Sequence, residues 1–277
     1  MRLGLTLFLA VLVAVASAAP ASAVYGRNGP YLDYATMVQL GEHGKLPRSV
    51  YPFGTYYTPV TVAQYGLQAA ANHAVTGRRV YRADALLAAN WLVRHQRPEG
   101  GWLYRFRFRV IGFEPLEPGW ISAMAQGQAM SLLWRAYRLR PHAPYRRASI
   151  RALRPFGRST AEGGVVSDFD GVPWYEEYPT QPGSHVLNGY QFSLLGLYDI
   201  APWSKGAGRL FRRGMASLRA RIERFDRPGG GSLYMPGLPA TAYYNKVHVD
   251  LLTAIDSVRP SDRLRDYRNR WWTQTVK

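Results

Sequence analysis

The chain has 277 residues, of which 35 are lysine or arginine and 18 are aspartate or glutamate, giving a formal net charge of +17. It contains no cysteine, which excludes disulfides, a thiolate site and a lipid-anchoring cysteine. The positive charge indicates a polyanionic partner, and on charge alone nucleic acid, an anionic membrane and an acidic polysaccharide fit equally well.

The first residues have the pattern of a secretory signal peptide. Met1 and Arg2 precede an apolar run over 3–16, and small residues follow at 21–23. We therefore predict a signal peptide over 1–23 and a secreted or extracytoplasmic single domain over 24–277, with no stable membrane insertion after cleavage. An N-terminal membrane anchor is the alternative, although the apolar run is short for a membrane span. Export argues against nucleic acid as the partner.

Helical spacing of apolar residues recurs along the rest of the chain and predicts about eight helices. They are expected over 60–75, 82–95, 121–139, 145–156, 186–200, 204–225, 243–255 and 261–272. Glycine clusters at 100–101, 163–164 and 229–231 recur roughly 60 to 70 residues apart, as expected if each closes a pair of antiparallel helices. The predicted fold is mainly α, an incomplete α/α barrel (toroid) with long aromatic and basic loops at one end.

Three segments lack a helical pattern: 26–57, 102–119 and 165–184. Loops of this length in a compact domain are functional or disordered, and their content of Tyr, Trp and Arg favours function. Residues 104–110 alternate aromatic and basic side chains, which predicts a short strand with Arg105, Arg107 and Arg109 on one face. That face can contact carboxylates or sulfates, or it can be a solvated hairpin arm.

Residues 174–182 read WYEEYPTQP and lead into VLNGY at 186–190. Glu176 and Glu177 are adjacent, so their side chains point in different directions and only one of them can face a given cleft. Pro179 and Pro182 restrict the backbone and predict a stiff loop ahead of a helix. From these residues alone, a catalytic loop and a surface loop with solvated acids and core tyrosines remain equally open.

Residues 174–200 resemble the matching stretch of the D-glucuronyl C5-epimerases of heparan sulfate biosynthesis. Three further blocks, in the family's order, resemble it as well: VAQYGL at 62–67, ANWLVRHQRPEGGW at 89–102 and LEPGWISAMAQGQAMSLLWRAY at 116–137. Animal members carry a large β-rich region between the first two blocks, where this chain has only residues 68–90. The resemblance is therefore to the family's C-terminal helical catalytic domain.

The resemblance implies an isomerase that converts D-glucuronate to L-iduronate residues within an acidic polysaccharide. We predict no cofactor and no metal site. Such an enzyme removes the C5 proton from one face of the ring and returns a proton to the other. Two alternatives remain: a polysaccharide lyase that uses the same proton abstraction, and a non-catalytic module that binds a polyanion. A homodimer is compatible with the sequence.

The resemblance also implies roles for single residues. The family's catalytic Glu-Tyr pair falls on Glu177 and Tyr178, and its second acid/base tyrosine falls on Tyr244. His248 matches a histidine of the same family segment, which makes it a catalytic candidate, and its spacing of four residues places it on the same helical face as Tyr244. Without the resemblance, that spacing favours a core role for both. The candidates for contacting the substrate are Asn188, Tyr234, Tyr175, Trp120 and Gln126.

One departure from the family concerns the cation that would neutralise the substrate carboxylate. The family has a Tyr-x-x-Arg element, whereas this chain has Gly237 three residues after Tyr234. On charge alone, Lys246, Arg105 and Arg107 are the candidates to take the place of the missing arginine.

Overall fold

The structure is a computed structural model that describes residues 25–29, 31–32 and 41–272. The predicted signal peptide lies outside the described residues. Eight α-helices occur in the described part, each within a few residues of its predicted position: α1 (Pro59–Thr76), α2 (Arg79–His95), α3 (Ala123–Leu139), α4 (Ala143–Arg151), α5 (Leu187–Asp199), α6 (Lys205–Arg221), α7 (Ala242–Val258) and α8 (Asp262–Trp272). None of these helices combines the length and apolar character that crossing a lipid bilayer requires.

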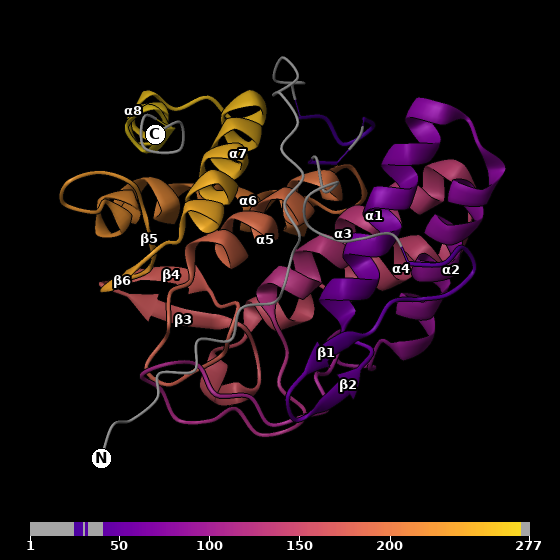
Figure 1. The fold of residues 1–277 in the computed structure, drawn as a ribbon, viewed down its shortest axis with the longest axis horizontal. Helices are drawn as coiled ribbons and strands as arrows, with labels where there is room; N and C mark the ends of the chain where they lie inside the picture. The colour runs from indigo at the N-terminus through magenta and orange to yellow at the C-terminus, as the bar shows by residue number, and fades with distance from the viewer. Residues whose placement is uncertain (1–24, 30, 33–40, 273–277) are drawn as a thin grey trace.

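The helices are arranged as a two-layered arc. The inner layer is the series α1, α3, α5 and α7, in which each helix packs on the next, and α2, α4, α6 and α8 each cover the inner helix that precedes them in the chain. Figure 1 shows α7 and α1 on opposite sides of the molecule, with α5 and α3 between them. This arrangement is an incomplete α/α toroid, which confirms the predicted fold class.

The centre of the arc is the contact between α3 and α5, where two glycines let the helices approach closely. A methyl group added to Gly127 would lie 2.5 Å from the carbonyl oxygen of Phe192 and 2.6 Å from the Cα of Ser193. Across the same contact, Arg135 donates to a carboxylate oxygen of Asp199 over 2.7 Å, and both side chains are buried. Close packing and a buried ion pair make this contact a fixed frame for the loops at the helix ends.

A hairpin precedes every inner helix. The hairpins are β1 (Ser49–Tyr51) with β2 (Gly54–Tyr56) before α1, a segment closed by the Phe108–Leu116 bridge before α3, β3 (Val166–Phe169) with β4 (Val172–Tyr175) before α5, and β5 (Leu233–Met235) with β6 (Leu238–Pro239) before α7. Side chains from the hairpins before α1, α3 and α7, and from the loop that follows β4, pack into one apolar cluster. The non-helical segments are therefore gathered at one end of the arc, as predicted.

The predicted alternation in 104–110 is present in the structure. Arg105, Arg107 and Arg109 are exposed, whereas Tyr104 and Phe106 are buried. The segment forms a single bridge rather than a regular strand. The predicted glycine clusters follow α2, α4 and the end of α6, and each contains glycine with φ between 74° and 107°, a region that favours glycine.

Candidate active site

Glu176 and Glu177 point in different directions, as the sequence predicts. The Glu176 carboxylate is fully buried and accepts hydrogen bonds from Ser184 Oγ (3.1 Å), from the backbone N–H of His185 (3.0 Å) and from the Ser167 hydroxyl. His185 Nδ1 also lies 2.8 Å from it. With both oxygens engaged, Glu176 holds the loop after β4 onto β3 and is not available for chemistry.

Glu177 occupies the N-terminal end of α5. This helix begins after Val186, whose side chain cannot cap it, and the backbone N–H of Gly189, the third helical residue, bonds instead to Glu177. Asn188 Nδ2 donates to Glu177 Oε2 over 3.3 Å. Because the third N–H of a helix is one that an N-cap side chain ordinarily satisfies, Glu177 acts as the cap of α5 from outside the helix.

Burial raises the pKa of Glu177 from its ordinary value near 4.5 to about 7, and the charge of Glu176 adds to this effect. The hydrogen bonds from Tyr178, Asn188 and Gly189 act in the opposite direction but do not outweigh burial. The carboxyl group is therefore balanced between its two protonation states near neutral pH, as suits a group that takes up and returns a proton.

Five tyrosines surround this carboxylate: Tyr51, Tyr104, Tyr178, Tyr234 and Tyr244. Burial is the main cause that raises the pKa of each phenol, and the negative charge of Glu177 raises it further. All five phenols are consequently neutral at physiological pH and able to donate. They come from the hairpins before α1, α3 and α7, from the loop after β4 and from the first turn of α7.

Three of these phenols form a continuous row that starts at Glu177. The Tyr178 side chain hydrogen-bonds to Glu177 and to Tyr234. The ring of Tyr234 in turn lies 4.7 Å, centroid to centroid, from that of Tyr244. Glu177 is thus linked to Tyr234 through the Tyr178 hydroxyl, and the ring contact places Tyr244 at the other end of the row.

Trp120 forms part of the wall of this site. Its indole stacks on Tyr104 with centroids 3.8 Å apart, and its Nε1 donates to the carbonyl of Phe106 over 3.1 Å. The ring of Phe108 stacks on that of Tyr178, with centroids 5.4 Å apart. These contacts fix the planes of two phenols that face Glu177.

His248 is fully enclosed behind this row. Its Nδ1 lies 2.7 Å from Ser232 Oγ, which itself donates to Asn245 Oδ1 over 2.9 Å, so Nδ1 carries the proton in the bond to Ser232. Burial lowers the pKa of His248 to about 3. The residue predicted as catalytic therefore stays neutral and ties α7 to the residue that precedes β5, two positions before Tyr234.

The three cations proposed from the sequence are placed away from Glu177. Lys246 Nζ pairs with Asp250 over 2.6 Å, and Arg107 Nε pairs with Glu117 over 2.9 Å, both at the surface. Arg105 lines a cavity that Glu177 does not reach. The expectation that one of them replaces the family's arginine beside the carboxylate is not supported by these positions.

Two predicted substrate-binding residues lie in the packed interior instead. Gln126 is fully buried and donates from Nε2 to the carbonyl oxygens of Gly100 (2.9 Å) and Ala152 (3.1 Å). Tyr175 is also fully buried, and its hydroxyl donates to the carbonyl of Leu210 over 2.9 Å. Both residues have a structural role within the blocks that resemble the family, because they tie loops and helices together.

Sequence reasoning missed three residues of the site. Tyr51 and Tyr104 approach Glu177 only because the hairpins before α1 and α3 fold over it, and no local pattern shows that contact. Gly189 was visible in the LNG motif but was given no role, although an added methyl group would lie 2.5 Å from Glu177 Oε2.

Comparison with known proteins identifies the family to which the chain is similar. Residues 95–273 match the family described as D-glucuronyl C5-epimerase C-terminus. The D-glucuronyl C5-epimerase of Caenorhabditis elegans is 35% identical over 222 residues, which cover 71% of this chain and 36% of that protein. An uncharacterized protein of Methanocaldococcus jannaschii, MJ1128, is 24% identical over 154 residues, covering 53% of this chain and 49% of that protein.

Among solved structures, a family 76 glycoside hydrolase from a bovine Bacteroides thetaiotaomicron strain aligns with a TM-score of 0.46 and 13% identity, over 73% of this chain and 43% of that one. The chain spans about a third to a half of the two curated relatives. The match over 95–273 includes Glu177, Tyr178, Asn188, Tyr234 and Tyr244. The chain belongs to the D-glucuronyl C5-epimerase C-terminus family.

Proposed function

We propose that this chain is an exported uronyl C5-epimerase that converts D-glucuronate to L-iduronate residues within an acidic polysaccharide. The observation that carries the proposal is a buried carboxylate, Glu177, with a pKa of about 7 among neutral phenols. Family membership supports the same reaction class. The net charge of +17 suits a polyanionic substrate.

In the forward reaction, the Glu177 carboxylate removes hydrogen from C5 as a proton and becomes a carboxylic acid. The electron pair left at C5 is shared with the adjacent uronate carboxyl group. Tyr244 then gives its phenolic proton to C5 from the opposite face, which inverts the centre and leaves a phenolate. Because Tyr244 is neutral at working pH, it is in the form that this step requires.

The row of phenols resets the site after inversion. The proton on Glu177 passes to Tyr178, the proton of Tyr178 passes to Tyr234, and that of Tyr234 passes to the Tyr244 phenolate. The first two transfers follow hydrogen bonds, and the last requires the Tyr234 hydroxyl to reach that of Tyr244, whose ring it contacts. The cycle consumes no net proton, and exchange of the carboxyl and phenol protons with solvent between turnovers lets deuterium reach C5 in heavy water.

Among the described residues, no cation is among the main groups that shift the pKa of Glu177, so the developing negative charge is stabilised by other means. Neutral phenols supply hydrogen-bond donors, and the N-terminal ends of α1, α3, α5 and α7 are directed towards the hairpins that carry the site. Partial positive charge at a helix N-terminus favours an anion, typically by about 0.3–1 kcal/mol for each helix. Preorganised dipoles of this kind are the means by which enzymes stabilise enolate-like transition states.

The test is to incubate the protein with glucuronate-containing polysaccharides in heavy water and to follow C5 deuterium and iduronate signals by NMR. We expect both signals with unchanged polymer length. Glu177→Gln keeps the size and hydrogen-bonding reach of the side chain, and we expect it to lower exchange by about 10²–10⁴-fold, the usual contribution of a general base. Its polymer affinity and thermal unfolding serve as controls for the fold.

Other outcomes have distinct meanings. Exchange at the wild-type rate in Glu177→Gln would exclude Glu177 as the base. An unsaturated uronate absorbance with falling polymer length would identify a lyase that uses the same proton abstraction. Polymer binding without exchange or cleavage would identify a non-catalytic module.

A further inference from the structure

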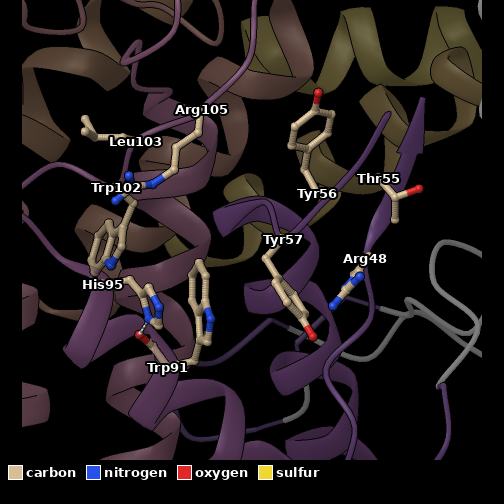
Figure 2. A pocket seen from close by; sticks show the side chains of 9 residues that line it. All are labelled: Arg48, Thr55, Tyr56, Tyr57, Trp91, His95, Trp102, Leu103 and Arg105. Atoms are coloured by element: carbon tan, nitrogen blue, oxygen red, sulfur yellow. Dashed lines mark hydrogen bonds between the residues drawn. The ribbon is translucent and has the colours of Figure 1, made fainter. Parts of the chain in front are cut away.

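A cavity of about 400 Å³ lies beside the hairpin β1–β2, next to the tyrosine site, the group formed by Glu177 and the five phenols near it. This is within the range of about 300–1,000 Å³ that small-molecule sites occupy. The lining comes from three parts of the chain: the region of β1 and β2, helix α2, and the segment after the first glycine cluster. The residues are Arg48, Thr55, Tyr56, Tyr57, Trp91, His95, Trp102, Leu103 and Arg105 (Figure 2).

The wall of the cavity is a row of flat rings with a cation at one end. The Arg48 guanidinium lies 4.7 Å from the ring centroid of Tyr57, which is 6.3 Å from that of Trp91. Trp91 stacks on His95 at 4.1 Å with an interplanar angle of 16°. Figure 2 shows Tyr57 between Arg48 and Trp91, with Arg105 near the opposite rim. Flat apolar faces flanked by cations match a sugar ring that carries an anionic group.

Neither guanidinium group in the cavity is neutralised within the described part of the chain. Arg48 and Arg105 are exposed and form no ion pair with a described residue, and no aspartate or glutamate lines the cavity. Arg107, two residues after Arg105, is by contrast engaged by Glu117. His95 Nδ1 lies 2.8 Å from the Trp91 carbonyl and must donate to it, so Nε2 is left as a further polar atom.

The cavity and the tyrosine site share a wall. Tyr104 faces Glu177, whereas the next residue, Arg105, lines the cavity. Phe106 is in ring contact with Tyr51, whose pKa the charge of Glu177 raises, and with Tyr56, which lines the cavity. An extended polymer lying across this wall can therefore contact both places.

The geometry points to this cavity as a binding site for an additional acidic sugar unit of the polymer, outside the unit that reacts at Glu177. The ring faces of Tyr57 and Trp91 contact the sugar, and Arg48 and Arg105 bind its carboxylate or sulfate. This inference rests on the proposed polysaccharide substrate. It assigns to the cavity the recognition of polymer length and charge, and leaves proton transfer to the tyrosine site.

The experiment measures binding by calorimetry, with size-defined oligosaccharides of two and eight units that contain glucuronate. The test protein is Arg48→Ala/Arg105→Ala, and the matched control is Arg146→Ala/Arg147→Ala, which removes two exposed arginines of α4 that do not line the cavity. We expect the test variant to bind the octasaccharide at least about tenfold more weakly, from the loss of charge-assisted contacts. The control variant is expected to change binding by less than about twofold.

A carboxyl-reduced octasaccharide, which carries glucose in place of glucuronate, completes a double-mutant cycle. We expect the wild-type protein to bind it more weakly and the test variant to lose nothing further, because both changes remove one interaction. Equal weakening in the test and control variants, or additive losses in the cycle, would overturn the inference in favour of diffuse charge attraction. So would an equal loss for the disaccharide and the octasaccharide.

The result can be separated from that for the proposed function. Binding to the cavity is measured without turnover, whereas exchange of C5 deuterium tests the reaction at Glu177. Loss of length-dependent binding in a protein that still exchanges C5 hydrogen would confirm both. Length-dependent binding lost with the arginines in a protein that shows no exchange would retain the cavity and reject the epimerase.

Discussion

The tyrosine site around Glu177 and the cavity lined by Arg48 and Arg105 share a wall, but their charged groups are arranged in opposite ways. The first has a carboxylate inside a ring of neutral phenols, and burial raises its pKa to about 7. The second has two exposed guanidinium groups beside flat aromatic faces and no acidic lining residue. Two consecutive residues belong to the two places, because Tyr104 faces Glu177 and Arg105 lines the cavity.

The difference shows why a cation near the reacting carbon would have two opposing effects. An arginine close to Glu177 would attract an anionic substrate, but it would also lower the pKa of the carboxylate and weaken it as a base. In the proposed function, separate sites avoid this conflict, because the cavity attracts the polymer while the phenols stabilise negative charge without adding a positive one. Three predictions test this division, from the largest expected effect to the smallest.

Tyr244→Phe removes the proton donor and keeps the ring. We expect C5 exchange to fall by about 10²–10⁴-fold with little change in polymer affinity, because affinity depends on the cavity. Tyr243→Phe is the matched control, since it removes a phenol of the adjacent residue, whose side chain is exposed. Equal activity losses in the two variants, measured as deuterium entry by NMR, would show that Tyr244 is not the donor.

Gly189→Ala displaces Glu177 without removing any reactive group. The added methyl group would lie 2.5 Å from Glu177 Oε2, so the carboxylate has to move. A shift of about 1 Å in a catalytic group can cost about 10²-fold in rate, which is the loss in kcat that we expect. Gly208→Ala is the control, because the nearest atom to its added methyl group is 3.5 Å away. Wild-type kcat in Gly189→Ala would contradict the capping geometry.

The raised pKa of Glu177 also predicts a dependence of stability on pH. The folded state binds the proton more tightly than the unfolded state, so the free energy of unfolding falls as pH rises from about 4.5 to about 7. The total is about 3 kcal/mol, since each tenfold change in proton affinity is worth about 1.4 kcal/mol. Glu177→Gln lacks this titrating group and therefore this loss. The difference in free energy of unfolding between variant and wild type, measured by urea unfolding at several pH values, should therefore change between about pH 4.5 and about pH 7.

Above pH 7 the difference should stay constant. Glu114→Gln, at an exposed carboxylate, should leave the pH dependence of the wild type unchanged. A Glu177→Gln protein whose stability follows the wild-type pH curve would mean that the carboxylate is not buried as described. Conversely, a stability difference between Glu177→Gln and wild type that changes with pH only in that range would confirm that no cation neutralises Glu177 in the folded protein.

Most of the fold was predictable from the sequence because it is repetitive. Apolar spacing identified the helices of all four pairs, and the three glycine clusters identified the ends of the first three pairs. The adjacency of Glu176 and Glu177 predicted correctly that their side chains point in different directions, whereas the choice of Glu177 and Tyr178 came from the resemblance to the family. The alternation in 104–110 correctly separated the exposed arginines from the buried aromatics.

The remainder depended on contacts between distant segments. Gln126 and Tyr175 lie in motifs similar to those of the family, but their partners are backbone carbonyls from other loops. The burial of His248 and the pairing of Lys246 with Asp250 depend on the surroundings of α7. The cavity that Arg105 lines was equally unpredictable, because other lining residues belong to β2 and α2, which approach Arg105 only in the folded chain.

The hairpin that precedes each inner helix makes the activity a reporter of complete folding. No single helix pair holds enough of the site to work, since Glu177 belongs to the third pair, whereas Tyr234 and Tyr244 belong to the fourth. If the fourth pair undocked, α5 and its carboxylate cap would remain, but the proton donor would be gone. Under the proposed function, a partly folded chain of this kind keeps the base but lacks the donor, so it cannot complete inversion at C5.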